Sequence, residues 1–166
     1  MRVSFYTESF KPYLSGVTVS VDTFSKWLTA LGHEVTVFAP EYPNFKDTDD
    51  YRVFRFPSLG VKAYPGFRLA LPYSADHDKY NAVNRPAIIH SHSPYQLGLL
   101  AQAYARREKI PFVYHFHTLF TEYLHFVPLK GWLIDVEKLK ADGKSHLLAG
   151  VEITKEGNFK VKFHDK

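Results

Sequence analysis

The stretch RVSFYTESFKPYLSGVTVSVDTFSKWLTALGHEVTVFAP, residues 2–40, decides the fold of this chain. Its start, residues 2–7, alternates apolar and polar side chains as a strand does, and a loop that contains Gly16 follows. Residues 17–31 then space their apolar side chains as an amphipathic helix does, and Gly32 is a natural helix stop. The run HEVTVFAP resumes a strand. The stretch therefore predicts one βαβ unit.

The same alternation continues further along the chain. Three more strand-like runs are found at residues 51–58, 87–93 and 110–118. A helix is predicted over 93–109, with Ser93 and Pro94 at its cap and first turn, and residues 58–75 stay unassigned. This order predicts an α/β protein with a Rossmann-like, doubly wound, mostly parallel sheet. In such sheets ligands bind at the carboxyl ends of the strands.

A change of composition divides the chain into residues 1–128 and residues 129–166. The second part contains none of the 11 Tyr, no Arg and no Pro, and it is rich in Lys. Residues 132–143 predict a short helix, and VEITKEGNFKVKF, residues 151–163, predicts a β-hairpin around a Gly-Asn turn. We expect a Rossmann-like domain over 1–128 and a separate helix and hairpin tail.

Composition excludes several function classes. The chain has no Cys, so disulfides and thiol catalysis are impossible. Its formal net charge is +4, but Lys and Arg are dispersed among acidic residues, which favours weak attraction to an anionic membrane surface over nucleic-acid binding. The sequence shows no secretory leader pattern and no run of about 20 apolar residues. We expect a cytoplasmic protein that is at most peripheral to the membrane.

The loop FKPYLSGVTVSV, before the first predicted helix, is a candidate phosphate site. A helix amino terminus exposes N–H groups and a positive dipole, and Gly16 lets the backbone approach a phosphate closely. An ordinary βα turn without a ligand explains the same residues equally well. Taken alone, the loop leaves both interpretations open.

Two His-x-His pairs end two of the predicted strands, His90 with His92 and His115 with His117. Residues two apart in a strand face the same side, so up to four imidazoles could converge if the strands are neighbours. Three interpretations stay open: structural side chains, a Zn²⁺ site, and recognition of a sugar hydroxyl or a phosphate oxygen. The lack of a carboxylate at ligand spacing argues against a metal.

Polar residues that follow the second His-x-His pair belong to the same candidate site. Thr118, Glu122 and Tyr123 follow His117 closely in the sequence. Glu122 is a candidate general base, although a solvated surface carboxylate is the more common role for such a residue. These residues extend the candidate site toward residue 128.

Three motifs, taken together, resemble the N-terminal domain of family 4 glycosyltransferases. They are the Ser-Gly-Val loop before the first helix, the strand GHEVTVFAP, and the pair HSHSP and FHTLFTEY, in this order and spacing. The resemblance covers residues 1 to about 128 and is strongest to the bacterial branch that glucosylates diacylglycerol. Residues 129–166 do not match the family's pattern.

The resemblance implies a GT-B enzyme that transfers a sugar with retention from a nucleotide-sugar donor, such as UDP-glucose, without a bound metal or other cofactor. Gly16 and Val17 would offer amides to the donor diphosphate, His117 would contact the transferred sugar as the catalytic candidate, and His92 would shape the floor of the cleft. Further cleft-lining candidates are Ser93, Thr118 and Glu122. Acceptor-side candidates are Tyr13, Tyr64, Phe67 and Tyr73.

Three hypotheses follow for the function of the chain. The first is the acceptor-side half of a glycosyltransferase acting on a lipid or glycan, inactive alone because no C-terminal donor domain is present. The second is a non-enzymatic scaffold whose hairpin at 151–163 pairs with a second copy or a partner domain. The third is a zinc hydrolase built on the four histidines. The resemblance favours the first.

Overall fold

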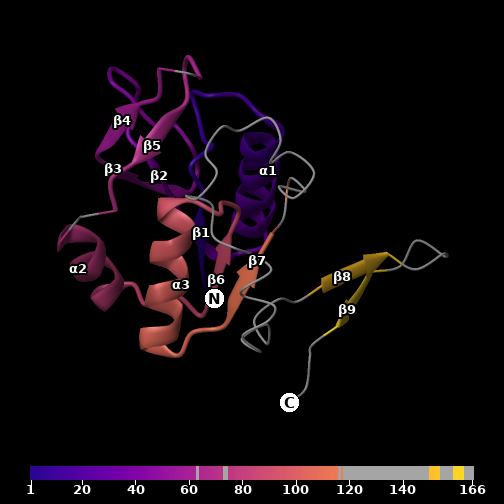
Figure 1. The fold of residues 1–166 in the computed structure, drawn as a ribbon. Helices are drawn as coiled ribbons and strands as arrows, with labels where there is room; N and C mark the ends of the chain where they lie inside the picture. The colour runs from indigo at the N-terminus through magenta and orange to yellow at the C-terminus, as the bar shows by residue number, and fades with distance from the viewer. Residues whose placement is uncertain (63, 73–74, 116, 118–149, 154–158, 163–166) are drawn as a thin grey trace, which may run out of the picture. The chain divides into compact units, whose positions relative to one another are not determined.

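The computed structural model describes residues 1–62, 64–72, 75–115, 117, 150–153 and 159–162 (Figure 1). The chain forms two compact units, Met1–His115 and Phe116–Lys166. Each unit is described by itself. Among the described residues, no helix has the length and apolar character needed to cross a membrane.

A five-stranded parallel sheet forms the centre of the first unit. Its strands are β1 (Arg2–Tyr6), β2 (Glu34–Pro40), β3 (Arg52–Phe56), β6 (Ile88–Ser91) and β7 (Phe112–Tyr114). Their order is β3-β2-β1-β6-β7, and every neighbouring pair is parallel. The chain thus winds outward in both directions from the centre, and the order reverses between β1 and β6. This arrangement confirms the predicted doubly wound, Rossmann-like α/β fold and locates its switch point.

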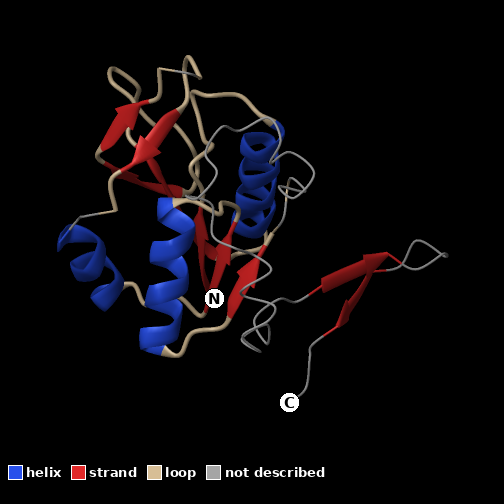
Figure 2. Ribbon diagram, viewed as in Figure 1, coloured by secondary structure: helices blue, strands red, loops and turns tan. Residues whose placement is uncertain are grey.

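Helices cover both faces of the sheet (Figure 2). Helix α1 (Gly16–Ala30) covers one face, where Val21 packs with the inward side chains of β1 and β2. Helix α3 (Gln96–Glu108) and helix α2 (Ala75–Val83) pack on the other face, around Tyr6 and Phe38. Because successive strand residues point to opposite faces, the strands β1, β2, β3 and β6 each supply both cores.

A hairpin and a helix occur in segments for which the sequence analysis makes no assignment. A short antiparallel hairpin, β4 (Ser58–Gly60) and β5 (Arg68–Ala70), lies in the segment 58–75. Helix α2 follows the hairpin. Its buried side carries the polar residues His77 and Asn81, so hydrophobic spacing in the sequence does not reveal this helix. The Nε2 atom of His77 lies 2.9 Å from both the Tyr6 hydroxyl and the Asn81 amide nitrogen, so polar contacts hold this helix.

Helix α3 corrects one boundary. It begins at Gln96 with Tyr95 as its N-cap residue, and the side chain of Tyr95 makes no capping hydrogen bond. Ser93 and Pro94 therefore precede the helix instead of starting it. By contrast, Gly32 ends the α1 segment as predicted, with a φ of +80° that favours glycine.

In the second unit, β8 (Gly150–Ile153) and β9 (Phe159–Lys162) form an antiparallel hairpin. This confirms the hairpin that the alternating tail sequence predicts. The helix predicted over 132–143 lies outside the described residues.

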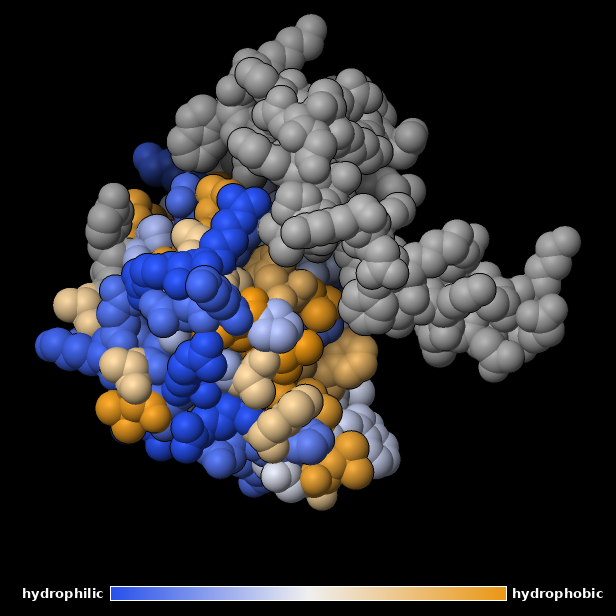
Figure 3. Space-filling model, turned by 90° about the horizontal axis from the view of Figure 1, so that it is seen from below, coloured by the Kyte–Doolittle hydropathy of each residue, from blue (hydrophilic) through white to orange (hydrophobic). Residues whose placement is uncertain are grey.

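Figure 3 shows the molecule from below, relative to the view of Figure 1. On this face, most hydrophilic residues gather on one side and most hydrophobic residues lie beside them. Toward the carboxyl end of α1, Trp27 is 67% exposed and Leu31 is 69% exposed. The carboxyl half of this helix therefore presents large apolar side chains to the outside.

Candidate functional site

The candidate site lies at the edge where the parallel strands end and the helices begin. Residues 7–15 follow β1, and residues 92–95 follow β6, so the two loops flank the switch point of the sheet. Helices α1 and α3 start directly after these loops. The fold thereby brings two helix amino termini and the ends of three strands to one edge.

A cluster of hydroxyl groups fixes the start of α1. Ser15 is the N-cap, and its Oγ accepts a hydrogen bond from the Thr18 N–H at 3.1 Å. The Ser9 hydroxyl lies 2.5 Å from the Ser15 hydroxyl and 3.2 Å from that of Thr18. The amides of Gly16 and Val17 belong to the first turn, where helix geometry provides no intrahelical acceptor. These two amides are the ones that the sequence predicts as phosphate ligands.

Gly16 itself leaves space at this helix start. A Cβ added to Gly16 would meet no protein atom within 4 Å, and its φ does not lie in the left-handed region. Neither packing nor backbone conformation within the described residues therefore requires a glycine here. Space for the close approach of a ligand is a physical reason for glycine that remains.

An ion-pair network holds the loop from the other side. The Lys11 ammonium donates to Asp22 at 2.7 Å and also pairs with Asp49, while the Tyr51 hydroxyl donates to Asp22 at 2.5 Å. Partial burial opposes the charged form, but the hydrogen bonds to Asp22 and Asp49 raise the pKa of Lys11. Lys11 therefore stays charged and ties the loop to α1 and to the segment before β3.

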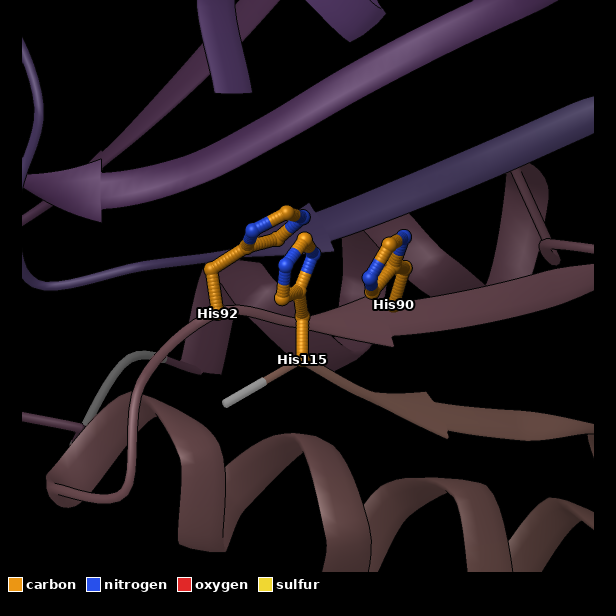
Figure 4. Close-up of side chains that lie close together, drawn as sticks. All are labelled: His90, His92 and His115. Carbon is orange, nitrogen blue, oxygen red and sulfur yellow. The ribbon is translucent and has the colours of Figure 1, made fainter. Parts of the chain in front are cut away.

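Three of the four predicted histidines lie together on the α1 face of the sheet (Figure 4). The ring centroids of His90 and His92 are 4.1 Å apart, and those of His92 and His115 are 5.0 Å apart. The Phe24 ring of α1 lies 6.3 to 6.4 Å from all three imidazoles, and Phe5 lies against His90 and His92. The convergence predicted from the two His-x-His pairs is thus confirmed for three rings.

The three imidazoles of this cluster range from partly to fully buried. His92 is only 4% exposed, and burial lowers the pKa of His115. The ligand nitrogens of the three residues lie within 4.8 Å of one another, whereas one tetrahedral zinc ion would need them about 3.3 Å apart. The rings of His90 and His115 are nearly parallel, at 11°, so their in-plane lone pairs do not point at one centre. Metal binding would require side-chain rotation.

Glu8 is the residue at this edge that the sequence interpretation missed. It follows β1, it is 1% exposed, and its carboxylate accepts hydrogen bonds from the Ser93 hydroxyl and, at 2.7 Å, from the Leu97 N–H. Burial raises the pKa of Glu8 to about 7, against the lowering effect of these hydrogen bonds. A charged residue inside the otherwise strand-like FYTES run is the signal that could have identified it.

Ser93 and Gly98 show how tightly the loop after β6 meets α3. Ser93 is buried, and its side chain points to Glu8. A Cβ added to Gly98 would lie 1.8 Å from the Ser93 carbonyl oxygen. Only glycine fits at position 98, because the loop backbone passes directly over the first turn of α3.

The acceptor-side candidates are partly brought together. The rings of Tyr13 and Phe67 meet edge to face with centroids 5.7 Å apart, and Tyr64 is 60% exposed in the same loop. Phe67 also lines a hollow beside the β4–β5 hairpin, whose walls are formed by Tyr42, Pro43, Gly60, Val61, Lys62, Gly66, Phe67 and Arg68. Tyr73 lies outside the described residues. The segment 58–72 thus forms an aromatic and basic surface.

The remaining candidates belong to the second unit. His117 is half-buried, and Thr118 and Glu122 lie outside the described residues. Their predicted roles stay predictions.

Similar sequences identify the family context. Residues 14–146 match the family model for Glycosyltransferase Family 4. The alpha-monoglucosyldiacylglycerol synthase of Acholeplasma laidlawii is 36% identical over 129 residues, 76% of this chain and 32% of the relative. A GDP-mannose-dependent alpha-mannosyltransferase of Corynebacterium glutamicum is 32% identical over 136 residues, 78% of this chain and 33% of the relative. The chain spans about a third of the length of these relatives.

A solved structure shows the same fold. Sucrose-phosphate synthase from Thermosynechococcus elongatus superposes with a TM-score of 0.54 at 16% identity, covering 87% of this chain and 40% of that one. The family match also continues past residue 128, to residue 146, so the prediction that residues 129–166 do not match the family is wrong for residues 129–146.

Proposed function

Because the chain belongs to glycosyltransferase family 4, we propose that it is the acceptor-side half of a retaining glycosyltransferase that moves a sugar from a nucleotide-sugar donor to a lipid or glycan acceptor. The observation that carries the proposal is the start of α1, where Gly16 leaves open space beside the switch point of the sheet. Ligands of doubly wound sheets bind at this position.

The donor diphosphate would bind at the amino terminus of α1. The amides of Gly16 and Val17 are directed there by the helix, and the helix dipole favours negative charge. The Ser15 cap and its hydroxyl neighbours hold this turn in place before a ligand arrives. A prepared site of this kind would stabilise the charge that develops on the departing phosphate.

The histidines would recognise the transferred sugar. A neutral imidazole both donates and accepts one hydrogen bond, which suits a sugar hydroxyl. His92 sits in the buried cluster and would form the floor of the cleft. By its position in the motif FHTLFTEY, His117 would contact the transferred sugar. Transfer would need no metal or other cofactor.

The aromatic and basic surface around the β4–β5 hairpin would meet the acceptor. Tyr13 and Tyr64 combine an apolar ring with a polar hydroxyl, Phe67 adds a wholly apolar ring, and Arg68 and Lys62 add positive charge beside them. Such side chains suit the boundary between a membrane and water. The name of the Acholeplasma laidlawii relative, a glucosyldiacylglycerol synthase, supports a lipid acceptor.

Sugar transfer onto lipid tests the proposal. Radiolabelled UDP-glucose is incubated with vesicles that contain diacylglycerol and with this chain, alone and together with the separately produced C-terminal half of the Acholeplasma laidlawii relative. We expect labelled glycolipid only in the combined reaction. No transfer in any combination whose two halves demonstrably associate would contradict the proposal.

A zinc-dependent activity is the second candidate function, and the three clustered imidazoles favour it. Isothermal titration of the chain with Zn²⁺, compared with a His90→Ala variant, decides this point. One tightly bound ion that the variant loses would support the zinc site. Equal, weak binding by both proteins would remove it.

A further inference from the structure

The starting observation is a buried carboxylate that the proposed sugar transfer does not use. Glu8 is 1% exposed and lies directly after β1, at the switch point of the sheet. Burying an ionisable group away from water is unfavourable, and here the cost appears as a pKa raised to about 7. Ionisable groups held at such a cost occur preferentially at functional sites.

Both oxygens of Glu8 have a defined partner on the far side of the switch point. Oε1 accepts the Leu97 N–H in the first turn of α3 at 2.7 Å, and Oε2 accepts the Ser93 hydroxyl. Ser93 in turn accepts the Tyr95 N–H at 3.3 Å through its Oγ. Glu8 therefore provides the side-chain cap that the N-cap residue Tyr95 does not provide.

The loop held in this way carries His92. The His92 N–H donates to the Tyr6 carbonyl at 2.8 Å, two residues before Glu8, and Ser93 follows next. The backbone of residues 91–95 is thus fixed at one end by β1 and at the other by the Glu8 carboxylate. Any shift of Ser93 away from Glu8 would move the His92 backbone with it.

We propose that Glu8 is a positioning residue of the site: its carboxylate sets the loop that carries His92 and locks this loop to the amino terminus of α3. The role in sugar recognition rests on the proposed function, whereas the positioning itself does not. The groups that face Glu8 are the hydroxyl of Ser93, the N–H of Leu97, and the rings of Tyr95 and Tyr114.

This arrangement makes the hydrogen bonds that hold the loop depend on pH. Burial first, and then the nearby Glu8 carboxylate, raise the pKa of both Tyr95 and Tyr114, so these rings stay neutral when Glu8 titrates. The charged carboxylate accepts two hydrogen bonds well, and a protonated carboxyl group accepts them less well. Protonation of Glu8 would remove the cost of its buried charge, but it would weaken these two hydrogen bonds and so loosen the loop and the first turn of α3 together.

NMR of the full chain and a Glu8→Gln variant tests the proposal, with Glu34→Gln as the matched control because Glu34 is exposed at the amino end of β2. In the wild-type protein, the amides of His92, Ser93 and Leu97 should titrate with one common midpoint near pH 7. The Glu8→Gln variant should lose this transition and shift the His92 ring signals, and Glu34→Gln should keep both. Separate midpoints in the wild-type protein, or an unchanged transition in Glu8→Gln, would overturn the proposal.

A UDP-glucose titration of the same three proteins separates this inference from the proposed function. If both stand, Glu8→Gln raises the dissociation constant at least fivefold relative to Glu34→Gln. If the wild-type chain binds no UDP-glucose but the common transition is present and Glu8-dependent, the proposed function fails and the positioning role stands.

Discussion

The amino termini of α1 and α3 lie at the same edge of one sheet, but they are capped in different ways. Helix α1 is capped locally by Ser15, and the space beside Gly16 is open. Helix α3 has no side-chain cap of its own, and the buried carboxylate of Glu8 occupies its first turn. The Glu8 carboxyl group thus fills one helix end from within the protein, and at the other, open end we propose that an external anion binds.

The two glycines near these helix starts repeat the contrast. A methyl group at Gly16 would meet no neighbouring atom in the described part of the chain, whereas at Gly98 it would collide with the Ser93 carbonyl at 1.8 Å. Glycine therefore serves packing at α3 and leaves space at α1. The difference teaches that the position of a ligand is set by what surrounds a helix end more than by the helix itself.

Gly98→Ala should disrupt the close packing of the loop after β6 against the start of α3. The added methyl group would collide with loop backbone that cannot rotate away, so we expect a loss of about 3 kcal/mol or more in the free energy of unfolding. Urea denaturation measures this loss. Gly60→Ala is the control, because its Cβ would meet only the Arg68 side chain at 3.7 Å, and a similar loss there would contradict the account.

Glu8→Gln should change how stability depends on pH. The pKa of Glu8 is raised from its ordinary value of 4.5 to about 7, so the folded protein binds more protons than the unfolded chain between these values. The stability from this group is complete below pH 4.5 and is lost as the pH rises through 7. Relative to Glu8→Gln, the wild-type protein should therefore lose up to about 3 kcal/mol between pH 4.5 and pH 8.

Urea denaturation at several pH values, repeated with Glu34→Gln, measures this effect. The exposed Glu34 makes only a surface ion pair with Arg2, so its variant should follow the wild-type curve. A Glu8→Gln curve parallel to that of the wild type would contradict the raised pKa of Glu8.

Ser15→Ala should destabilise the amino terminus of α1. The change removes the acceptor of the Thr18 N–H and the partner of the Ser9 hydroxyl, so we expect a loss of about 1 kcal/mol in unfolding free energy. Thermal denaturation measures it. Ser20→Ala, inside the same helix, should be neutral or slightly stabilising, since alanine favours helices.

The smallest effect should come from His115. Burial lowers its pKa, so its contribution to stability is present above the ordinary histidine pKa of about 6.5 and is lost as the pH falls through the lowered value. This slope is opposite in sign to that of Glu8. A His115→Gln variant should lose less stability on going from pH 7.5 to pH 5 than the wild-type protein does, as measured by urea denaturation midpoints.

The sequence predicts the sheet well because its signals are local. The alternation in β1 and β2, the apolar spacing of α1 and the stop at Gly32 all lie within residues 2–40. The start of α3 was predicted at Ser93 because a serine before an apolar run is a typical cap. The actual cap comes from Glu8, 89 residues earlier than its partner Leu97, and no local pattern contains it.

The candidate site was predictable to a similar degree. The period of two in a strand predicts that the histidines converge only if their strands are neighbours, and the pairing of β6 with β7 in the structure meets this condition for His90, His92 and His115. Helix α2 was missed since its buried side is polar, with His77 and Asn81 paired in the interior. Long-range hydrogen bonds, unlike hydrophobic periodicity, leave little trace in a single sequence.

The most direct test of the account is an amide NMR titration of the chain with UDP-glucose, repeated with a Gly16→Ala variant. The account predicts shifts at Gly16 and Val17 but none at Leu97, and at least tenfold weaker binding by a Gly16→Ala protein of unchanged stability. Shifts centred on Leu97, equal binding by the variant, or no shift at millimolar UDP-glucose would contradict the claim that α1 is the open helix end.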